Sequence, residues 1–195
     1  MNDLKKLINF KPTGIKVNSG KFLISEPLIP DPIFKRSVLF LAEYDSDGAF
    51  GLIVNKPTDY KVSDVVDTFG KCDMPVYIGG PVHTDQLFFL HSIGLISGSY
   101  EVIDGVYWGG DLMEVKAMLH TGEINENNFR FFIGYSGWTS MQLEDEIKKE
   151  SWLIAESTKK EIFSEQAEKL WVEKVKSFGN QYQNWLNIPV NPQMN

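Results

Sequence analysis

Residues 36–55 read RSVLFLAEYDSDGAFGLIVN, two apolar runs joined by a short polar segment. The joining residues, Asp45-Ser-Asp-Gly48, are typical of a turn, and Pro57 stops the second run. The pattern predicts strands over Arg36–Glu43 and Phe50–Asn55 that pair as an antiparallel hairpin. The hairpin is the starting point of a predicted sheet, and the flanking sequence shows how that sheet continues.

Similar short apolar runs, each bounded by turn residues, lie on both sides of this hairpin. They predict strands over Lys21–Ser25, Val76–Ile78, Leu87–His91, Phe129–Tyr135 and Trp152–Glu156, and a second hairpin over Glu101–Trp108 that turns at Asp104-Gly105. Between the first two predicted strands, Asp31 and Pro32 are typical of the cap and the first residue of a single helical turn.

One helix is predicted to begin after Asp111 and to end at Gly122. Glu114 stands three residues after Asp111, where a capping-box carboxylate is expected. The apolar face of this predicted helix is formed by Leu112, Val115 and Leu119.

Two further helices complete the predicted elements. One starts at a capping box formed by Thr139 and Gln142, and the other covers Ser164–Phe178 and ends at Gly179. The predicted strands occur in clusters, with helices between only some of them. This imperfect alternation favours an α+β fold with a mixed, mostly antiparallel sheet and flanking helices over a doubly wound parallel sheet.

The composition is that of a globular chain with a large aromatic core. Of its 195 residues, 43% are hydrophobic and 13% aromatic, and no linker-like segment interrupts the interior. We predict a single domain over 1–195, with an N-terminal arm at 1–19 and a flexible tail at 189–195. Because there is one cysteine, Cys72, and neither a signal peptide nor a membrane-length apolar run, we expect a cytoplasmic protein without a membrane partner.

The net charge of −7 is distributed unevenly along the chain. Residues 1–36 carry seven Lys or Arg against three Asp or Glu, whereas residues 37–195 carry twelve against twenty-three. An acidic body repels phosphate, and the chain has only two arginines, Arg36 and Arg130. Direct nucleic-acid binding by the body is therefore disfavoured. The basic arm over 1–19 is the one segment whose charge is compatible with it.

Catalytic and metal-binding motifs are incomplete in this sequence. Gly134-Tyr-Ser136-Gly-Trp138 approaches the nucleophile elbow of serine hydrolases, but tryptophan replaces the last glycine of that motif. The histidines His83, His91 and His120 lack metal-ligand spacing, so we predict neither a metal site nor a cofactor. His91 fits a hydrogen-bonded histidine at a strand end, and His83, in a predicted loop, is the best candidate for acid–base work.

Two glycine pairs and one acidic helix are further candidate sites. Gly79-Gly80 and Gly109-Gly110 lack the spacing of phosphate-binding loops, and Asp111 repels an anion at the second pair. Gln142 and Glu146 share one face of a predicted helix. A solvated helix face explains these carboxylates better than acid–base chemistry does.

Several blocks together resemble the YqgE/AlgH family, a bacterial family without an established biochemical activity. They are Gly20–Pro27, Asp31–Leu41, Gly48–Pro57, Gly79–Val82, Phe131–Trp138, Gln142–Glu146 and Ser151-Trp152. The resemblance implies an α+β fold whose sheet folds into a barrel-like core. Members are often labelled transcriptional regulators, a role that the acidic body does not support physically.

The family pattern points to Arg36, Ser37, Asn55, Gln142 and Glu146 as polar residues with a function. Two positions depart from that pattern, since Tyr44 stands where many members carry histidine and Met141 replaces a glycine. Together with the loop and aromatic candidates, the predicted binding residues are Arg36, Ser37, Asn55, Gly79, Gly80, His83, Trp138, Gln142 and Glu146.

Three functional hypotheses remain open at this point. The preferred one is a non-catalytic regulatory or binding protein whose partner is an unknown protein or small molecule. The second is an enzyme in which Gly79–His83 and Trp138–Glu146 meet in one pocket. The third is gene regulation through DNA contact by the basic arm.

Overall fold

The computed structural model describes residues 10–94 and 96–189. Its strands are β1 (Lys21–Ser25), β2 (Val38–Tyr44), β3 (Gly48–Ile53), β4 (Pro57–Lys61), β5 (Pro75–Ile78), β6 (Val82–His91), β7 (Tyr100–Ile103), β8 (Val106–Trp108), β9 (Phe129–Thr139) and β10 (Trp152–Glu156). Its α-helices are α2 (Val62–Val65), α3 (Leu112–Thr121), α4 (Gln142–Lys148), α5 (Lys159–Ile162), α6 (Leu170–Ser177) and α7 (Gln183–Asn187). Short 3₁₀ turns are η1 (Pro32–Phe34), η2 (Asp67–Phe69), η3 (Ala167–Lys169) and η4 (Asn180–Tyr182).

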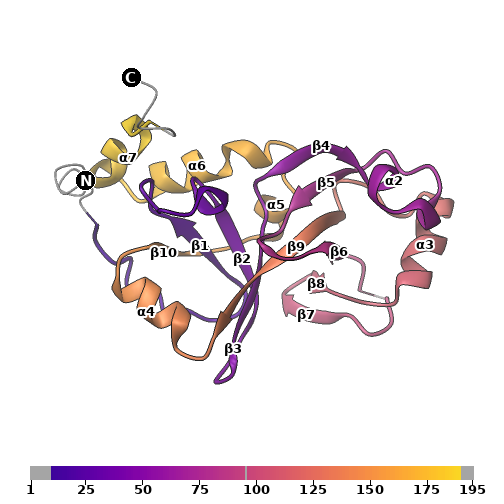
Figure 1. Ribbon diagram of the computed structural model, residues 1–195, viewed down its shortest axis with the longest axis horizontal. Coiled ribbons are helices and arrows are strands. Elements are labelled where there is room, and N and C mark those ends of the chain that lie inside the picture. The colour runs from indigo at the N-terminus through magenta and orange to yellow at the C-terminus, as the bar shows by residue number, and fades with distance from the viewer. Residues whose placement is uncertain (1–9, 95, 190–195) are drawn as a thin grey trace.

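The fold is α+β, with one large mixed sheet that is mostly antiparallel. The strand order is β10-β1-β2-β3-β9-β6-β8-β7, and β5 joins β9 in a parallel pairing, with β4 beside it. Strand β9 is shared by two halves of the molecule (Figure 1). The first half holds β1–β3 and β10, and the second holds β4–β8.

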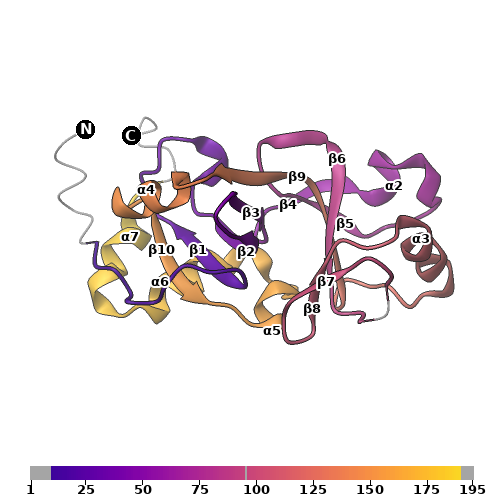
Figure 2. The ribbon, with the colours of Figure 1, turned by 90° about the horizontal axis from the view of Figure 1, so that it is seen from below.

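The sheet is not closed, which corrects the barrel-like core implied by the family resemblance. Its strand order has two ends, β10 and β7, which do not pair with each other in the described part of the chain. Residues Phe129–Tyr135 of β9 pair with β6, whereas Ser136–Thr139 pair with β3. The two halves therefore extend in different directions from β9, and Figure 2 shows helices at both far ends.

A glycine in the left-handed region marks the change of partner along β9. Gly134 has φ of 67°, and a Cβ there would come within 2.6 Å of the carbonyl oxygen of Gly80. Gly80 in turn crosses the Tyr135 peptide so closely that a Cβ would sit 2.2 Å from its carbonyl carbon. Glycine is required at both positions because only hydrogen fits between the two backbones.

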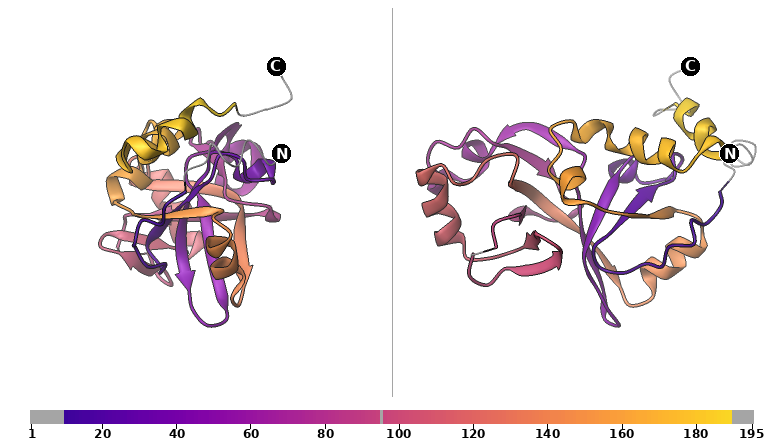
Figure 3. Two further views of the ribbon diagram at one scale, coloured as in Figure 1. Left: turned by 90° about the vertical axis from the view of Figure 1, so that its left-hand side faces the viewer. Right: turned by 180° about the vertical axis from the view of Figure 1, so that it is seen from behind.

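Both faces of the first half are covered, which explains why its strands read as continuous apolar runs. Phe22, Phe40 and their neighbours pack under α6, around Trp171. On the opposite face, Leu39 and its neighbours pack with Trp152 beneath α4. In the second half, a separate apolar cluster lies between the sheet and helices α2 and α3, and Figure 3 shows the β2–β3 hairpin projecting away from it.

Most predicted strands are confirmed, and two of them agree to the residue. These are β1 and β10, and the hairpin of β2 and β3 turns at the predicted Asp45–Gly48. The predicted helical turn forms as η1, with the Asp31 side chain accepting a hydrogen bond from Ile33 N–H. Strands β6 and β9 are longer than predicted, and β4, α2, α5 and α7 were not predicted.

The predicted helix caps are partly wrong. Asp111 caps α3, but Glu114 accepts a hydrogen bond from Ser97 N–H rather than closing a capping box, and Leu112 is exposed. Gln142 accepts from Thr139 N–H, yet Met141 occupies the cap position of α4 because Thr139 still belongs to β9. The third predicted helix starts later, at Leu170.

Of the predicted tail only Pro189 is described, and residues 1–9 of the predicted arm lie outside the described residues. Of the arm, residues 10–19 are described, and they contain neither a helix nor a strand. Within residues 10–94 and 96–189, no helix is both long enough and apolar enough to cross a bilayer.

Candidate functional site

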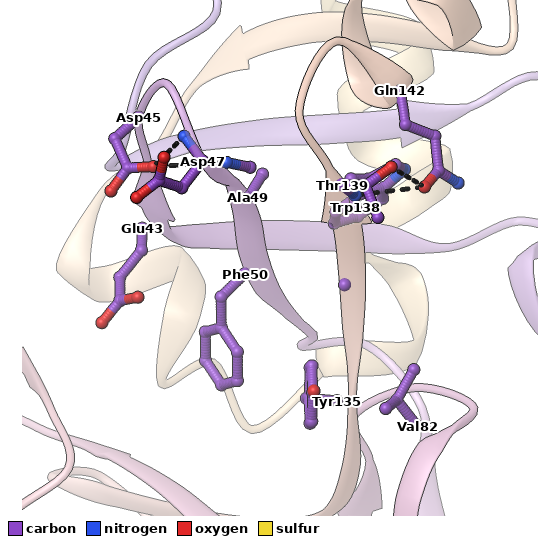
Figure 4. Close-up of a pocket in the computed structure, with 12 residues that line it drawn as sticks. Glu43, Asp45, Asp47, Ala49, Phe50, Val82, Tyr135, Trp138, Thr139 and Gln142 are labelled. Carbon is purple, nitrogen blue, oxygen red and sulfur yellow. Dashed lines mark hydrogen bonds between the residues drawn. The ribbon is translucent and has the colours of Figure 1, made fainter.

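A groove of about 480 Å³ lies where the β2–β3 hairpin meets the end of β9 (Figure 4). Residues from four strands, from the β2–β3 turn and from the start of α4 line it. They are Glu43, Asp45, Asp47, Gly48, Ala49, Phe50, Val82, Tyr135, Gly137, Trp138, Thr139 and Gln142. We refer to this site as the groove.

Strand register places three of these residues in one row across the sheet. Phe50 is opposite Gly137 on β9 and opposite Glu43 on β2. Directly opposite residues in a sheet point to the same face, so the Glu43 and Phe50 side chains project on one side. Gly137 has no side chain and is exposed, which leaves a shallow floor beside the Phe50 ring.

Aromatic rings form one wall of the groove. The Phe50 ring lies 4.5 Å from that of Trp108 and 4.8 Å from that of Tyr135, measured between ring centroids. His83 stacks on the other side of Tyr135 at 5.8 Å. None of these rings is fully buried. The wall therefore offers partly exposed aromatic rings of the kind that bind cations or apolar groups.

Carboxylates from the end of β2 and from the hairpin turn also line the groove. Glu43 accepts a hydrogen bond from the Trp108 indole N–H at 3.1 Å, which fixes it beside the aromatic wall. Asp45 Oδ1 accepts from the N–H groups of Asp47 and Gly48 and so shapes the hairpin turn. The lining residues include three carboxylates and neither lysine nor arginine, so the groove attracts positive charge.

Two of the predicted binding residues line the groove, and three others lie beside it. Trp138 and Gln142 are lining residues. Gly79 accepts a hydrogen bond from Ser136 Oγ at 3.1 Å, and Gly80 crosses the neighbouring peptide. His83 has φ of 49° and is exposed. The segments Gly79–His83 and Trp138–Gln142 are thus adjacent along β9.

Glu146 lies on the opposite side of the sheet from the groove floor, where its hydrogen bonds connect α4, β9 and β10. One of its carboxylate oxygens accepts from the indole N–H of Trp138 at 2.9 Å and of Trp152 at 2.8 Å. The other accepts from the Gln142 amide at 3.1 Å. The predicted shared face of Gln142 and Glu146 is confirmed. The contact joins α4 to β9 and β10.

The remaining predicted residues, Arg36, Ser37 and Asn55, lie away from the groove in a buried cluster that we call the junction. Asn55 Oδ1 accepts from Val38 N–H at 2.7 Å, and its Nδ2 donates to the Arg36 carbonyl at 2.9 Å. Arg36, with φ of 50°, donates to the Ile188 carbonyl and lies 5.1 Å from the Trp171 ring centroid.

Ser37 completes the junction through backbone contacts. Its N–H donates to Ser25 Oγ at 2.8 Å, and its hydroxyl donates to the Ile33 carbonyl at 3.0 Å. Lys56 was missed by the sequence argument, and its Nζ donates to the same Ile33 carbonyl at 2.6 Å. Burial lowers the pKa of Lys56 to about 8, against an opposing effect from the Asp31 charge.

The other two histidines have structural surroundings. His91 is fully buried, with the Tyr107 and Phe129 rings stacked on it at 5.6 and 5.5 Å. Its Nδ1 accepts from Ile93 N–H, so Nε2 carries the proton and donates to the Gly109 carbonyl. Burial lowers the pKa of His91 and favours this neutral form. The prediction of a hydrogen-bonded histidine at a strand end is confirmed.

His120 contacts the Lys116 carbonyl through Nδ1, one helical turn back along α3. Across the part of the chain that the structure describes, no three histidine, cysteine or carboxylate side chains come together as a metal site.

Residues 22–183 match the model of the AlgH-like family. The chain belongs to the AlgH-like family. A UPF0301 protein of Chlorobium phaeobacteroides is 41% identical over 92% of this chain and 97% of its own length. A UPF0301 protein of Cytophaga hutchinsonii is 38% identical over 92% of this chain and all of its own length. The resemblance predicted from the sequence blocks is thereby confirmed.

Solved structures share the fold of this AlgH-like chain. The AlgH protein of Pseudomonas aeruginosa is 27% identical, with a TM-score of 0.72 over 88% of this chain and 94% of that one. The protein DIP2367 of Corynebacterium diphtheriae has the same TM-score at 19% identity, over 92% and 96% of the two chains. These relatives carry family names that specify no activity, so the function of the AlgH-like chain is argued from its groove.

The groove residues Glu43, Phe50 and Gly137 were missed by the sequence argument. The turn at Asp45–Gly48 contained part of the signal, because it fixes Glu43 opposite Phe50 once the hairpin register is set. The pairing of β3 with β9 joins residues that are 85 to 91 positions apart, and no local pattern specifies it.

Proposed function

We propose that this AlgH-like chain is a cytoplasmic, non-catalytic binding protein whose groove holds a positively charged ligand, and that occupancy of the groove is how it regulates a partner. The row of Glu43, Phe50 and Gly137 is the observation that carries the proposal. A cation placed over the open floor would meet partly exposed aromatic rings and, beside them, the Glu43 carboxylate. Such cation–π contacts contribute about 0.5–2 kcal/mol each.

The polar residues around the groove already have structural partners, which supports binding over catalysis. Glu146 holds two indole N–H groups and the Gln142 amide, and Gln142 Oε1 also accepts from Thr139 N–H. Asp45 is used in its own turn. The groups that can still contact a ligand are thus the aromatic rings and those carboxylate oxygens of the groove that accept no hydrogen bond from the protein. A nucleic-acid ligand is not proposed for the groove because its carboxylates repel phosphate.

One observation favours the second hypothesis, an enzyme. The segments Gly79–His83 and Trp138–Gln142 come together at the groove, and His83 adopts a left-handed backbone conformation that is costly outside glycine. An exposed imidazole at such a position fits a general base. Turnover of a generic ester or phosphate ester that disappears in His83→Ala would select this hypothesis over the first.

Titration with small charged probes tests the proposed function directly. Acetyl-arginine-amide and its neutral counterpart, acetyl-glutamine-amide, are added to ¹⁵N-labelled protein while backbone amide shifts are recorded. We expect the arginine probe to shift the amides of Glu43, Phe50 and Gly137 with a Kd on the order of 1–10 mM, and the glutamine probe to bind more weakly.

Matched variants assign the binding to the groove. Phe50→Ala is expected to weaken binding of the arginine probe about three- to tenfold through loss of the cation–π contact. Tyr60→Ala removes another exposed ring, 61% exposed on β4, and is expected to leave binding unchanged. Equal binding by the two probes, or shifts confined to other surfaces, would overturn the proposal.

A further inference from the structure

We propose that the ligand is an extended protein segment that adds to the free edge of β9 at Gly137 and carries an arginine or lysine over Phe50. This inference rests on the proposed function and specifies its partner. It starts from the end of β9, where the sheet has an open side next to the groove.

The last residues of β9 have a strand partner on one side. Ser136–Thr139 pair with β3, whereas on the other side the pairing with β6 ends at Tyr135, opposite Val82. Among residues 10–94 and 96–189, no further strand pairs with this side of β9. The chain leaves the edge at Gly80-Pro81, and proline has no N–H with which to extend the ladder.

The free backbone groups of this edge belong to Gly137. A Cβ at Gly48 would lie 2.1 Å from the Trp138 carbonyl oxygen, so Trp138 directs its backbone groups toward β3. Along an antiparallel strand, the backbone N–H and C=O groups of successive residues point to opposite edges. Gly137 and Thr139 therefore direct their N–H and C=O groups to the open side of β9. Thr139 N–H is already bonded to Gln142 Oε1, and Gly137 is exposed.

A strand added here would continue the row that forms the groove. It would lie in line with β6 and antiparallel to β9, about 4.8 Å from it. Its residue opposite Gly137 would exchange two backbone hydrogen bonds with that glycine and point its side chain to the Phe50 face. Because Gly137 has no side chain, a long side chain can cross it and place its head group between the Phe50 ring and Glu43.

Charge and backbone chemistry together select the occupant. Three carboxylates and no cation line the groove, so the side chain over Phe50 should be arginine or lysine. The unpaired N–H and C=O of Gly137 are satisfied by a polypeptide backbone and not by a small cation. This combination of edge pairing with one side-chain pocket is the recognition mode known as β-strand addition.

The probe for this inference is the peptide acetyl-Thr-Val-Arg-Val-Thr-amide, titrated into ¹⁵N-labelled protein. We expect the Gly137 amide to shift downfield as its N–H gains a bond, and its hydrogen exchange to slow. Methylating the arginine backbone nitrogen removes the donor to the Gly137 carbonyl and is expected to weaken binding at least about tenfold. Replacing arginine by glutamate should weaken binding about tenfold or more, through repulsion at Glu43.

Variants of the protein test the same bond from the other side. Gly137→Pro removes the outward N–H and keeps the pairing with β3, since proline is tolerated on open strand edges. Gly137→Ala keeps the N–H but places a Cβ on the groove floor, 2.9 Å from the Tyr135 ring, so it measures the steric cost of a side chain here with the bond retained. We expect peptide binding to be lost in Gly137→Pro and weakened less in Gly137→Ala. If Gly137→Pro does not fold, the N-methyl peptide decides the question with the unaltered protein.

The outcomes separate this inference from the proposed function. If the N-methyl peptide binds as tightly as its parent while Phe50→Ala weakens both, the cation site stands and strand addition is overturned. If neither the peptides nor acetyl-arginine-amide shift the groove amides, both proposals fall. Concentration-dependent dimerisation that the peptide does not displace would identify a second copy of the chain as the occupant and overturn the inference.

Discussion

The junction and the groove use polar residues in opposite ways. At the junction, Ser37 and Asn55 are buried, and their polar atoms bond to backbone groups of strands and turns. In the groove, Glu43 and Gly137 are exposed, and Phe50 is only partly covered. Buried hydrogen-bonded groups fix a fold, whereas half-exposed rings and carboxylates remain free to meet a ligand.

The contrast changes how the sequence motifs of this family should be interpreted. The polar residues of the most extended blocks, Arg36 and Asn55, serve the crossing between β2, β3 and the chain after α7. The groove depends instead on strand register and on one position without a side chain. We therefore expect substitutions at the junction to change stability and substitutions in the groove to change binding.

The largest expected effect on stability comes from Gly80, which lies beside the groove but is needed for the fold. Gly80→Ala should lower the free energy of unfolding by about 3 kcal/mol or more, because its Cβ would lie 2.2 Å from the Tyr135 backbone and neither backbone can retreat. Equilibrium urea unfolding measures the change. Gly122, the cap of α3 in the left-handed helical region, also has positive φ but has open space around its Cβ position, so Gly122→Ala should cost only about 1 kcal/mol. Equal losses in the two variants would contradict the close crossing at Gly80.

Asn55→Ala is expected to have the next largest effect. The change leaves Val38 N–H and the Arg36 carbonyl without partners in a buried site, at a cost of about 2–3 kcal/mol. Asn55→Asp keeps the acceptor for Val38 but places a buried carboxylate against the Arg36 carbonyl, so at neutral pH its loss should be at least as large. Urea unfolding gives both values. The shift of the Gly137 amide with acetyl-arginine-amide should persist in folded Asn55→Ala, and its loss would show that the junction and groove are coupled.

Local patterns predicted the elements of the fold well and its assembly poorly. The hairpin of β2 and β3, strands β1 and β10 and the cap at Asp111 are specified by nearby turn residues and by apolar runs. The parallel contact of β5 with β9 and the change of partner at Gly134 depend on chain segments far apart in sequence. An isolated glycine in an apolar run signals a bulge, but it does not specify which strands lie beside it.

The candidate site was predicted only at its borders. Trp138 and Gln142 were identified from motifs, whereas Glu43 and Phe50 are individually unremarkable strand residues. Their importance arises when the register places them in one row with Gly137. Arg36, Ser37 and Asn55 were selected with the same reasoning and lie elsewhere. A motif reports that a residue is constrained, and the structure is needed to tell folding from binding.

A smaller, pH-dependent effect is expected at the edge of the junction. The pKa of Lys56 is about 8 in the folded protein, below the ordinary value of 10.5, so between these values the unfolded chain holds more protons. Stability linked to Lys56 therefore rises as pH increases from about 8 to 10.5, and the cost of the buried charge is fully present below pH 8. Lys56→Met should remove this rise, of about 1 kcal/mol after allowance for partial exposure.

Urea unfolding at pH 7 and pH 9.5 measures the Lys56 effect as the difference between the parent protein and the variant. Lys61→Met is the control, because hydrogen bonding to Asp73 raises the pKa of Lys61 and moves its titration above this range. A pH dependence that is unchanged in Lys56→Met would show that the Lys56 amine is as well solvated in the folded protein as in the unfolded chain.

The smallest expected effect on stability comes from the groove itself. Glu43→Gln keeps an oxygen to accept the Trp108 indole N–H, and Glu43 is exposed, so the free energy of unfolding should change by no more than about 0.5 kcal/mol. Binding of acetyl-arginine-amide should nevertheless weaken about two- to fivefold, since a carboxylate near the bound guanidinium has been neutralised. Glu101→Gln, on exposed β7 outside the groove lining, should change neither quantity. If Glu43→Gln instead destabilised the protein as much as Asn55→Ala does, Glu43 would be needed for stability. The proposed difference, in which the junction serves stability and the groove serves binding, would then be wrong.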